Sequence, residues 1–132
     1  MLSERGVTVT NGLTADIDGS AHRGALDNGD RAVAVHGCGV DRIHPAQQKA
    51  SRQTILPQGV VSSEFPLSDP PCSYRFSRRN RIIFGLCVET FVVQAAANGG
   101  VHFHPNALAN KAVRYLRTPL QCATHCWNVF NC

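Results

Sequence analysis

The first hundred residues alternate short, β-branched apolar runs with longer stretches that carry helix start and stop signals. The apolar runs predict four strands, at 6–12, 31–39, 59–65 and 89–96. Between them, composition and flanking Pro or Asn-Gly signals predict helices at 17–29, 45–56 and 78–87. This alternation is typical of a parallel sheet covered by helices on both faces. We therefore expect an α/β fold with a Rossmann-like, doubly wound sheet.

The size and charge of the chain narrow its function class. At 132 residues it can form one domain, and its net charge of +4 is compatible with binding to polyanions. No apolar run approaches the roughly 20 residues that span a bilayer, and the first residues do not resemble a signal peptide. We expect a cytoplasmic protein with reduced thiols and no membrane contact.

The six cysteines and the late histidines do not predict a metal site. The spacing of Cys122, Cys126 and Cys132, with His125 between them, matches no zinc pattern with paired ligand arms. The chain also lacks a Walker loop, an H-E-x-x-H helix and a complete dinucleotide fingerprint. We therefore expect no cofactor, no metal and no enzymatic activity.

The stretch "FSRRNRIIFG" at 76–85 is the most unusual in the chain. If Ser77 caps a helix, Arg78, Arg79 and Asn80 lie in its first turn, where free N–H groups bind anions and the macrodipole disfavours cations. Arginines there are favourable if they bind a phosphate. A solvated basic helix start explains the same residues, and spacing alone does not decide between the two. Phe76 could stack on an unpaired base.

Several segments together resemble the DNA-processing protein A family (DprA/Smf). They are "GVTVTNGLTADIDGSAHRGAL", "AVHGCGVDRIHP", "SSEFPL", "FSRRNRIIFGLC" and "FVVQAAANGG", in the family's order and spacing over about residues 4–100. The resemblance implies an extended Rossmann fold that binds single-stranded DNA in natural transformation, helps to load the RecA recombinase, forms homodimers and has no catalytic activity. On this basis the DNA-binding residues would be Arg78, Arg79, Asn80, Arg81, Gly12 and Phe76, with Gly12 allowing close backbone approach.

The chain also departs from the family pattern. Asn11, Ala15 and Asp16 replace a serine, an arginine and a glycine of the first loop, and an added carboxylate beside a phosphate pocket should weaken binding. The family's upstream strand with its G-S/T-R loop is not visible. We therefore expect an incomplete sheet with an unpaired edge.

Residues 101–132 do not continue the family pattern. Reverse translation of "KAVRYLR" at 111–117, read in another frame, can give the family string G-R-E-V-F-A. We therefore divide the chain into a partial family domain at 1–100 and a poorly ordered, out-of-frame tail at 101–132, in which 106–116 could still form a helix. The alternatives to retained DNA binding are an inert pseudogene product and a nucleotide-processing Rossmann enzyme of the phosphoribohydrolase type. The last of these would need a P-G-G-x-G-T loop, which is absent from the sequence.

Overall fold

The computed structural model describes residues 6–14, 17–94, 112–115 and 125–131. These residues form one sheet of six strands in the order β3-β2-β1-β6-β4-β5. Its first half consists of β1 (Val7–Asn11), β2 (Ala32–His36) and β3 (Gly59–Ser63), which are mutually parallel. Its second half consists of β6 (His125–Asn131), β4 (Glu89–Gln94) and β5 (Ala112–Tyr115).

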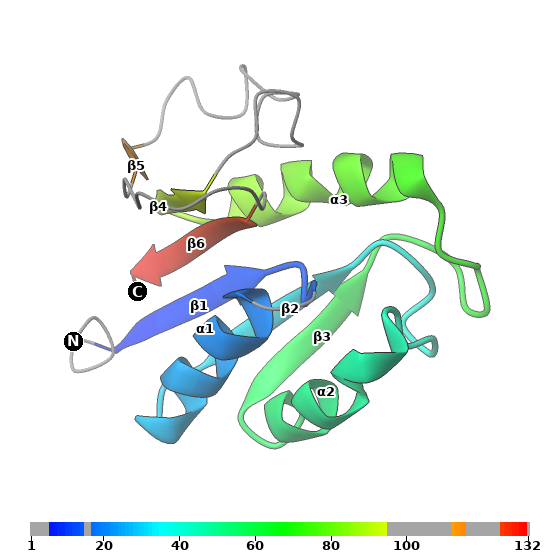
Figure 1. Cartoon of the computed structure of the whole chain (residues 1–132), viewed down its shortest axis with the longest axis horizontal. Helices are drawn as coiled ribbons and strands as arrows, with labels where there is room; N and C mark the ends of the chain where they lie inside the picture. The colour runs from blue at the N-terminus through cyan, green and yellow to red at the C-terminus, as the bar shows by residue number, and fades with distance from the viewer. Residues whose placement is uncertain (1–5, 15–16, 95–111, 116–124, 132) are drawn as a thin grey trace.

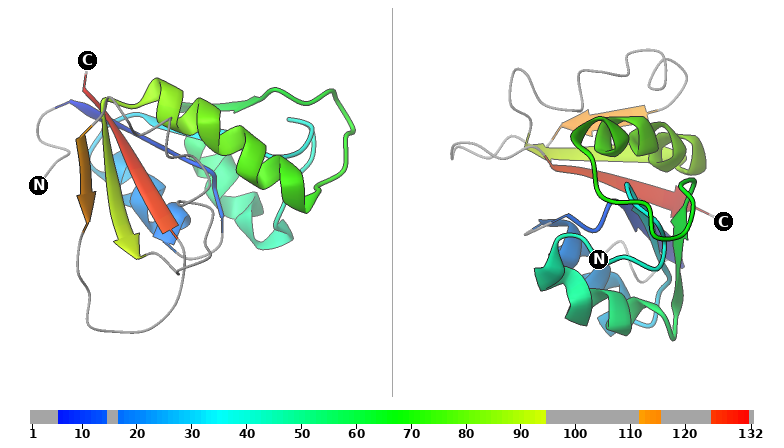
Figure 2. Two further views of the ribbon diagram at one scale, coloured as in Figure 1. Left: turned by 90° about the horizontal axis from the view of Figure 1, so that it is seen from above. Right: turned by 90° about the vertical axis from the view of Figure 1, so that its right-hand side faces the viewer.

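Helices cover both faces of the sheet, as the alternating pattern predicts. On one face, α1 (Ile17–Asp27) packs beside α2 (Lys49–Ile55), which follows a short 3-10 turn, η2 (Ala46–Gln48). On the other face, α3 (Ser73–Leu86) runs across β2, β1 and β6 (Figures 1 and 2). The expected α/β, Rossmann-like class is confirmed. No helix of the described residues is long and apolar enough to cross a bilayer.

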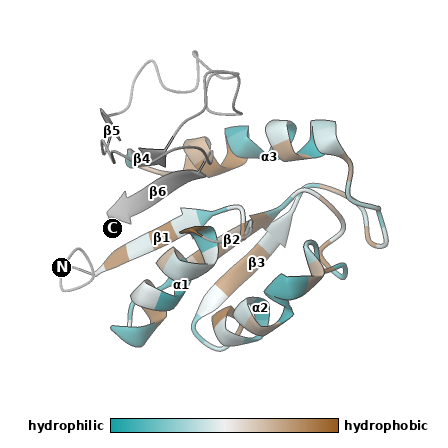
Figure 3. Ribbon diagram, viewed as in Figure 1, coloured by the Kyte–Doolittle hydropathy of each residue, from teal (hydrophilic) through white to brown (hydrophobic). Residues whose placement is uncertain are grey.

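The strand β2 separates two small cores, because successive side chains of a strand point to opposite faces. Ala32 and Ala34 pack toward α1 and α2, where the core is completed by Leu13, Leu26 and Ile55. Val35 packs on the opposite face against α3, together with Ile83 and Cys87. In Figure 3, α3 accordingly changes from a hydrophilic start to a hydrophobic end. The first turns of α3, which begin at Ser73, thereby lie beyond this core.

The start of α3 corrects the sequence prediction. The helix begins at Ser73, after Cys72 at the N-cap position, and not after Ser77. The residues 73–77, which precede the helix predicted at 78–87, are therefore helical. Only the residues up to Pro71 are held out of the helix by the Pro-Pro pair, because a proline restricts the residue before it. The arginines at 78, 79 and 81 lie beyond the first turn of α3, where backbone N–H groups are hydrogen-bonded within the helix. They therefore cannot form the anion site that was expected at a helix start.

The central strand β6 was not expected from the sequence. It pairs antiparallel with both β1 and β4, with Val7 opposite Asn131 and Glu89 opposite Val129. The edge of β1 that was expected to be unpaired therefore has a hydrogen-bonded neighbour, and the sheet is mixed. Residues 112–115, placed in a possible helix, form a strand parallel to β4. The predicted boundary at residue 100 and the out-of-frame origin of the tail stay predictions.

Candidate functional site

Arg79 is buried, with 4% of its surface exposed. Its Nη1 donates hydrogen bonds to the carbonyl oxygens of Gly12, at 2.7 Å, and of Val35. Its Nε donates to Oδ1 of Asn80 at 3.0 Å. A Cβ atom on Gly12 would overlap the guanidinium, so glycine is required here by the approach of Arg79. Arg79 thus joins the carboxyl ends of β1 and β2 to α3.

The interior around Arg79 includes this buried cation and a neutral imidazole. Burial lowers the pKa of Arg79 to about 10, partly offset by the nearby Asp18 and Cys38. Burial also lowers the pKa of His36 to about 4, and the positive charges of Arg52 and Arg79 add to this effect. At neutral pH Arg79 is therefore cationic and His36 is neutral. His36 is a group that the sequence did not single out.

Arg78 and Arg81 lie on the exposed side of α3. Their side chains are 58% and 52% exposed, and both contact the carboxylate of Glu64, which directly follows β3. The Nε of Arg78 lies 3.5 Å from Oε1 of Glu64, and Arg81 Nη2 forms an ion pair with Oε2. These two arginines are accessible to a polyanion, whereas Arg79 could contact a phosphate only by leaving the two carbonyls.

Phe76 is half-buried where the loop after β2 meets α3. Its ring stacks on that of His44, with centroids 5.4 Å apart and an angle of 26° between the planes. The guanidinium of Arg79 lies 5.9 Å from the Phe76 ring centroid. A Cβ atom on Gly37 would lie 2.6 Å from the ring, so a glycine is needed for Phe76 to pack against the end of β2. The edge of a fixed aromatic platform therefore reaches the surface.

A second aromatic and basic group lies beside this platform. Arg75 lies 5.0 Å from the ring centroid of Phe65 and 5.6 Å from that of Tyr74. It also forms an ion pair of 2.6 Å with Asp69. Phe65 lies in the loop that connects β3 to α3, so the path of this loop brings the two rings to the same arginine.

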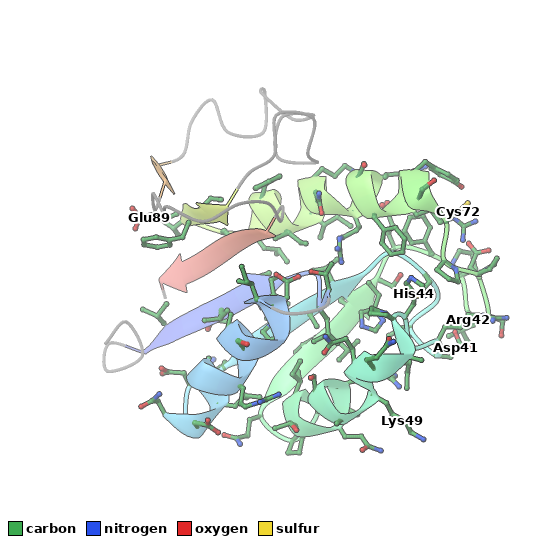
Figure 4. The ribbon with its side chains drawn as sticks, in the orientation of Figure 1. Asp41, Arg42, His44, Lys49, Cys72 and Glu89 are labelled. Atoms are coloured by element: carbon green, nitrogen blue, oxygen red, sulfur yellow. The ribbon has the colours of Figure 1, made fainter. Side chains whose placement is uncertain are left out.

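The loops after β2 and β3 are held together at the same end of the molecule. The carboxylate of Asp41 accepts hydrogen bonds from the backbone N–H of Ser68 at 2.7 Å and from its hydroxyl at 2.9 Å. Arg42 Nε donates to the Ser68 carbonyl at 2.7 Å. Figure 4 shows Asp41, Arg42 and His44 at this end, below Cys72 at the start of α3, with Lys49 farther down beside α2. The site thus has fixed loops and several surface cations.

The predicted site residues divide into an interior set and a surface set. In the interior set, Gly12 and Arg79 hold a strand end to α3, and the half-buried Asn80 accepts a hydrogen bond from Arg79; the surface set consists of Phe76, Arg78 and Arg81. Asp16 and Ala15, which distinguish the first loop, lie outside the described residues. No group of three or more potential metal ligands occurs within the described part of the chain. The side chains of the late cysteines lie outside it.

Comparison with known proteins gives consistent matches. The family model described as DNA recombination-mediator protein A matches residues 1–118. Protein Smf of Escherichia coli K12 is 47% identical over 100 residues, which cover 75% of this chain and 27% of that protein. The DNA processing protein DprA of Streptococcus pneumoniae R6 is 36% identical over 97 residues, or 74% of this chain and 34% of that one.

A solved structure shows the same fold. The X-ray structure of DNA processing protein A from Streptococcus pneumoniae aligns with a TM-score of 0.78 and 31% sequence identity. The alignment covers 90% of this chain and 43% of that chain. The present chain thus spans about a quarter to a third of the length of the two curated relatives named above.

Proposed function

Since the chain belongs to the DNA recombination-mediator protein A family, we propose that it binds single-stranded DNA through the surface formed by residues 76–81 of α3 and the loops after β2 and β3. The observation that carries the proposal is the exposure of Arg78 and Arg81 on the same helix as Phe76. Phosphates require cations, and unpaired bases stack on aromatic rings; this surface offers both.

Each residue has a role in this proposal. Arg78 and Arg81 contact phosphates, which matches their exposure, and Phe76 stacks on a base from the platform it shares with His44. Arg79, Asn80 and Gly12 position α3 against the strand ends from the interior. This arrangement gives the arginines of "SRRNR" separate tasks, because neighbouring helical residues point in different directions.

The proposed biological role follows the family. We place the chain in DNA processing and recombination during transformation, without catalysis, with RecA recombinase as a protein partner and a homodimer as the assembly. The role rests on the resemblance, since the chain spans 27% of the Escherichia coli relative. Co-sedimentation with RecA on single-stranded DNA tests the partner, and sedimentation velocity tests the assembly.

The binding test is a fluorescence anisotropy titration with short single-stranded oligonucleotides at several salt concentrations. The double variant Arg78→Ala/Arg81→Ala should bind more weakly, and its slope of log K against log salt should fall by about 1.4, because each phosphate contact on a single strand contributes about 0.7. The matched control is Arg23→Ala/Arg31→Ala, which removes two exposed cations from α1 and the opposite end of β2. It should keep the slope of the parent.

Two outcomes would count against the proposal. Folded protein that gives flat anisotropy at low salt would favour the alternative of an inert product. Equal losses in the test and control variants would place the interface elsewhere. In the same titration, Phe76→Leu should weaken binding without changing the salt slope, because stacking releases no counterions.

A further inference from the structure

Glu64 is the acidic group at the centre of the proposed interface. It directly follows β3, and its side chain is 18% exposed, while the two arginines that it contacts are more than half exposed. The chain on either side of it is fixed. The hydroxyl of Ser63 donates to the carbonyl of Cys38 at 2.6 Å and accepts from the N–H of Phe65 at 3.1 Å. The carboxylate is therefore held in place beneath the arginines.

One carboxylate oxygen of Glu64, Oε1, has an ionic contact but no hydrogen bond to any described residue. Oε1 is buried and has no hydrogen-bond partner among the described residues, and its nearest cation, Arg78, lies 3.5 Å away. Oε2 pairs with Arg81. One carboxylate thus serves two guanidinium groups. A partly desolvated carboxylate with one oxygen unbonded is costly to keep for stability alone.

A phosphate that binds Arg78 and Arg81 must use the same guanidinium groups that Glu64 contacts. The phosphate and the carboxylate compete for the same N–H donors, and they repel each other as like charges. The arginines can turn outward because their side chains are largely exposed, whereas Glu64 is held by its neighbours.

We propose that Glu64 acts as a resident counter-anion, which occupies Arg78 and Arg81 when DNA is absent and lowers their affinity for phosphate when DNA binds. This inference rests on the proposed DNA-binding function and assigns a specificity-setting role to a residue within the same site. Glu64 thereby makes the interface bind an oligonucleotide in preference to a single phosphate group, because one phosphate gains little binding free energy over the carboxylate that it displaces. Several phosphates bound together outweigh that single competitor.

The test compares Glu64→Gln with Asp27→Asn in the same oligonucleotide titration. Both variants remove one negative charge, but Asp27 is exposed at the last residue of α1, at the opposite end of the sheet. Glu64→Gln should tighten binding about threefold to tenfold at low salt, the range expected of one charge at contact distance near a surface. Asp27→Asn should change affinity less than twofold, because water and salt screen a charge at the opposite end of the sheet far more than one in contact with the arginines.

A third variant shows whether the effect passes through the arginines. Glu64→Gln added to Arg78→Ala/Arg81→Ala should give no gain, since the groups that Glu64 occupies are then absent. A melting curve of each variant shows whether it is folded, so that affinities are compared only between folded proteins. Equal affinities of Glu64→Gln and Asp27→Asn, or an unchanged gain without the arginines, would overturn the role of Glu64 alone. If no variant binds DNA, the proposed function fails and this inference with it.

Discussion

The two halves of the sheet are built in different ways. In the parallel half, β1, β2 and β3 follow one another along the chain, and α1 and α2 connect neighbours. In the other half, the strand between β1 and β4 comes from residues 125–131 and runs antiparallel to both. The first half is therefore assembled from contacts close in sequence, and the second depends on pairing between distant segments.

The candidate site belongs to the parallel half. Arg79 joins the ends of β1 and β2, and Glu64 follows β3, so β6 supports the site indirectly, by pairing with β1 and by contacting α3. A change confined to β4, β5 or β6 should therefore lower the stability of that half of the sheet more than it lowers the affinity for DNA. The following predictions test that difference, beginning with the largest expected effect.

Ending the chain after residue 124 removes β6 and leaves β1 and β4 without their shared neighbour. We expect the β4–β5 pair to lose its structure, because a two-stranded pair is at best marginally stable in water. Amide hydrogen exchange followed by mass spectrometry should show β4 losing its protection while β2 and β3 retain much of theirs. Protection of β4 that survives the truncation would show that the halves are held together by other contacts.

Arg79→Met tests the connection inside the parallel half. The change leaves the carbonyls of Gly12 and Val35 without their buried donor, and we expect the free energy of unfolding to fall by about 3–5 kcal/mol. Arg78→Met is the matched control and should change stability by less than about 0.5 kcal/mol, because it removes only an exposed ion pair. Urea unfolding of both variants measures the difference. Similar losses would mean that Arg79 has no special structural role.

Acid should destabilise the parallel half through its buried histidines. Burial lowers the pKa of both His22 and His36 from 6.5 to about 4. The unfolded chain then binds more protons than the folded one between these values, so stability is full above about pH 6.5 and falls as the pH drops toward 4. At pH 5 the loss should be about 2 kcal/mol per histidine.

Melting temperatures measured from pH 7.5 to 5 test this pH dependence. The variant His22→Gln should show a shallower dependence than the parent, because one of the two shifted groups is gone. A melting temperature that is flat across this interval would show that the histidines are charged or accessible in the folded protein.

Much of the parallel half could be predicted from sequence because its signals are local. Val33 and Val35 alternate with Ala32 and Ala34, and the strand that they predict is the one observed. The start of α3 was missed because Ser77 is a good capping residue and the Pro-Pro pair suggested an extended loop. The observed N-cap, Cys72, makes no side-chain capping bond, so it left no signal to read.

The rest of the site could not be predicted because it depends on contacts between segments distant in sequence. The exposure of Arg78 and the burial of Arg79 are set by where α3 crosses β2, and the arginines look alike in the sequence. Glu64 and His44 are identified as site residues only by their contacts with Arg81 and Phe76 of α3. β6 was missed for the same reason. Its partners are the distant strands β1 and β4, and its own residues do not indicate with which strands it pairs.

The position of β6 also has a consequence for the order of folding. Val7 pairs with Asn131, so the middle of the sheet joins residues from nearly opposite ends of the 132. During synthesis, β1 leaves the ribosome long before its antiparallel neighbour exists, and its edge stays open until residues 125–131 emerge. Contacts of such high sequence separation slow folding, since a long loop must close first.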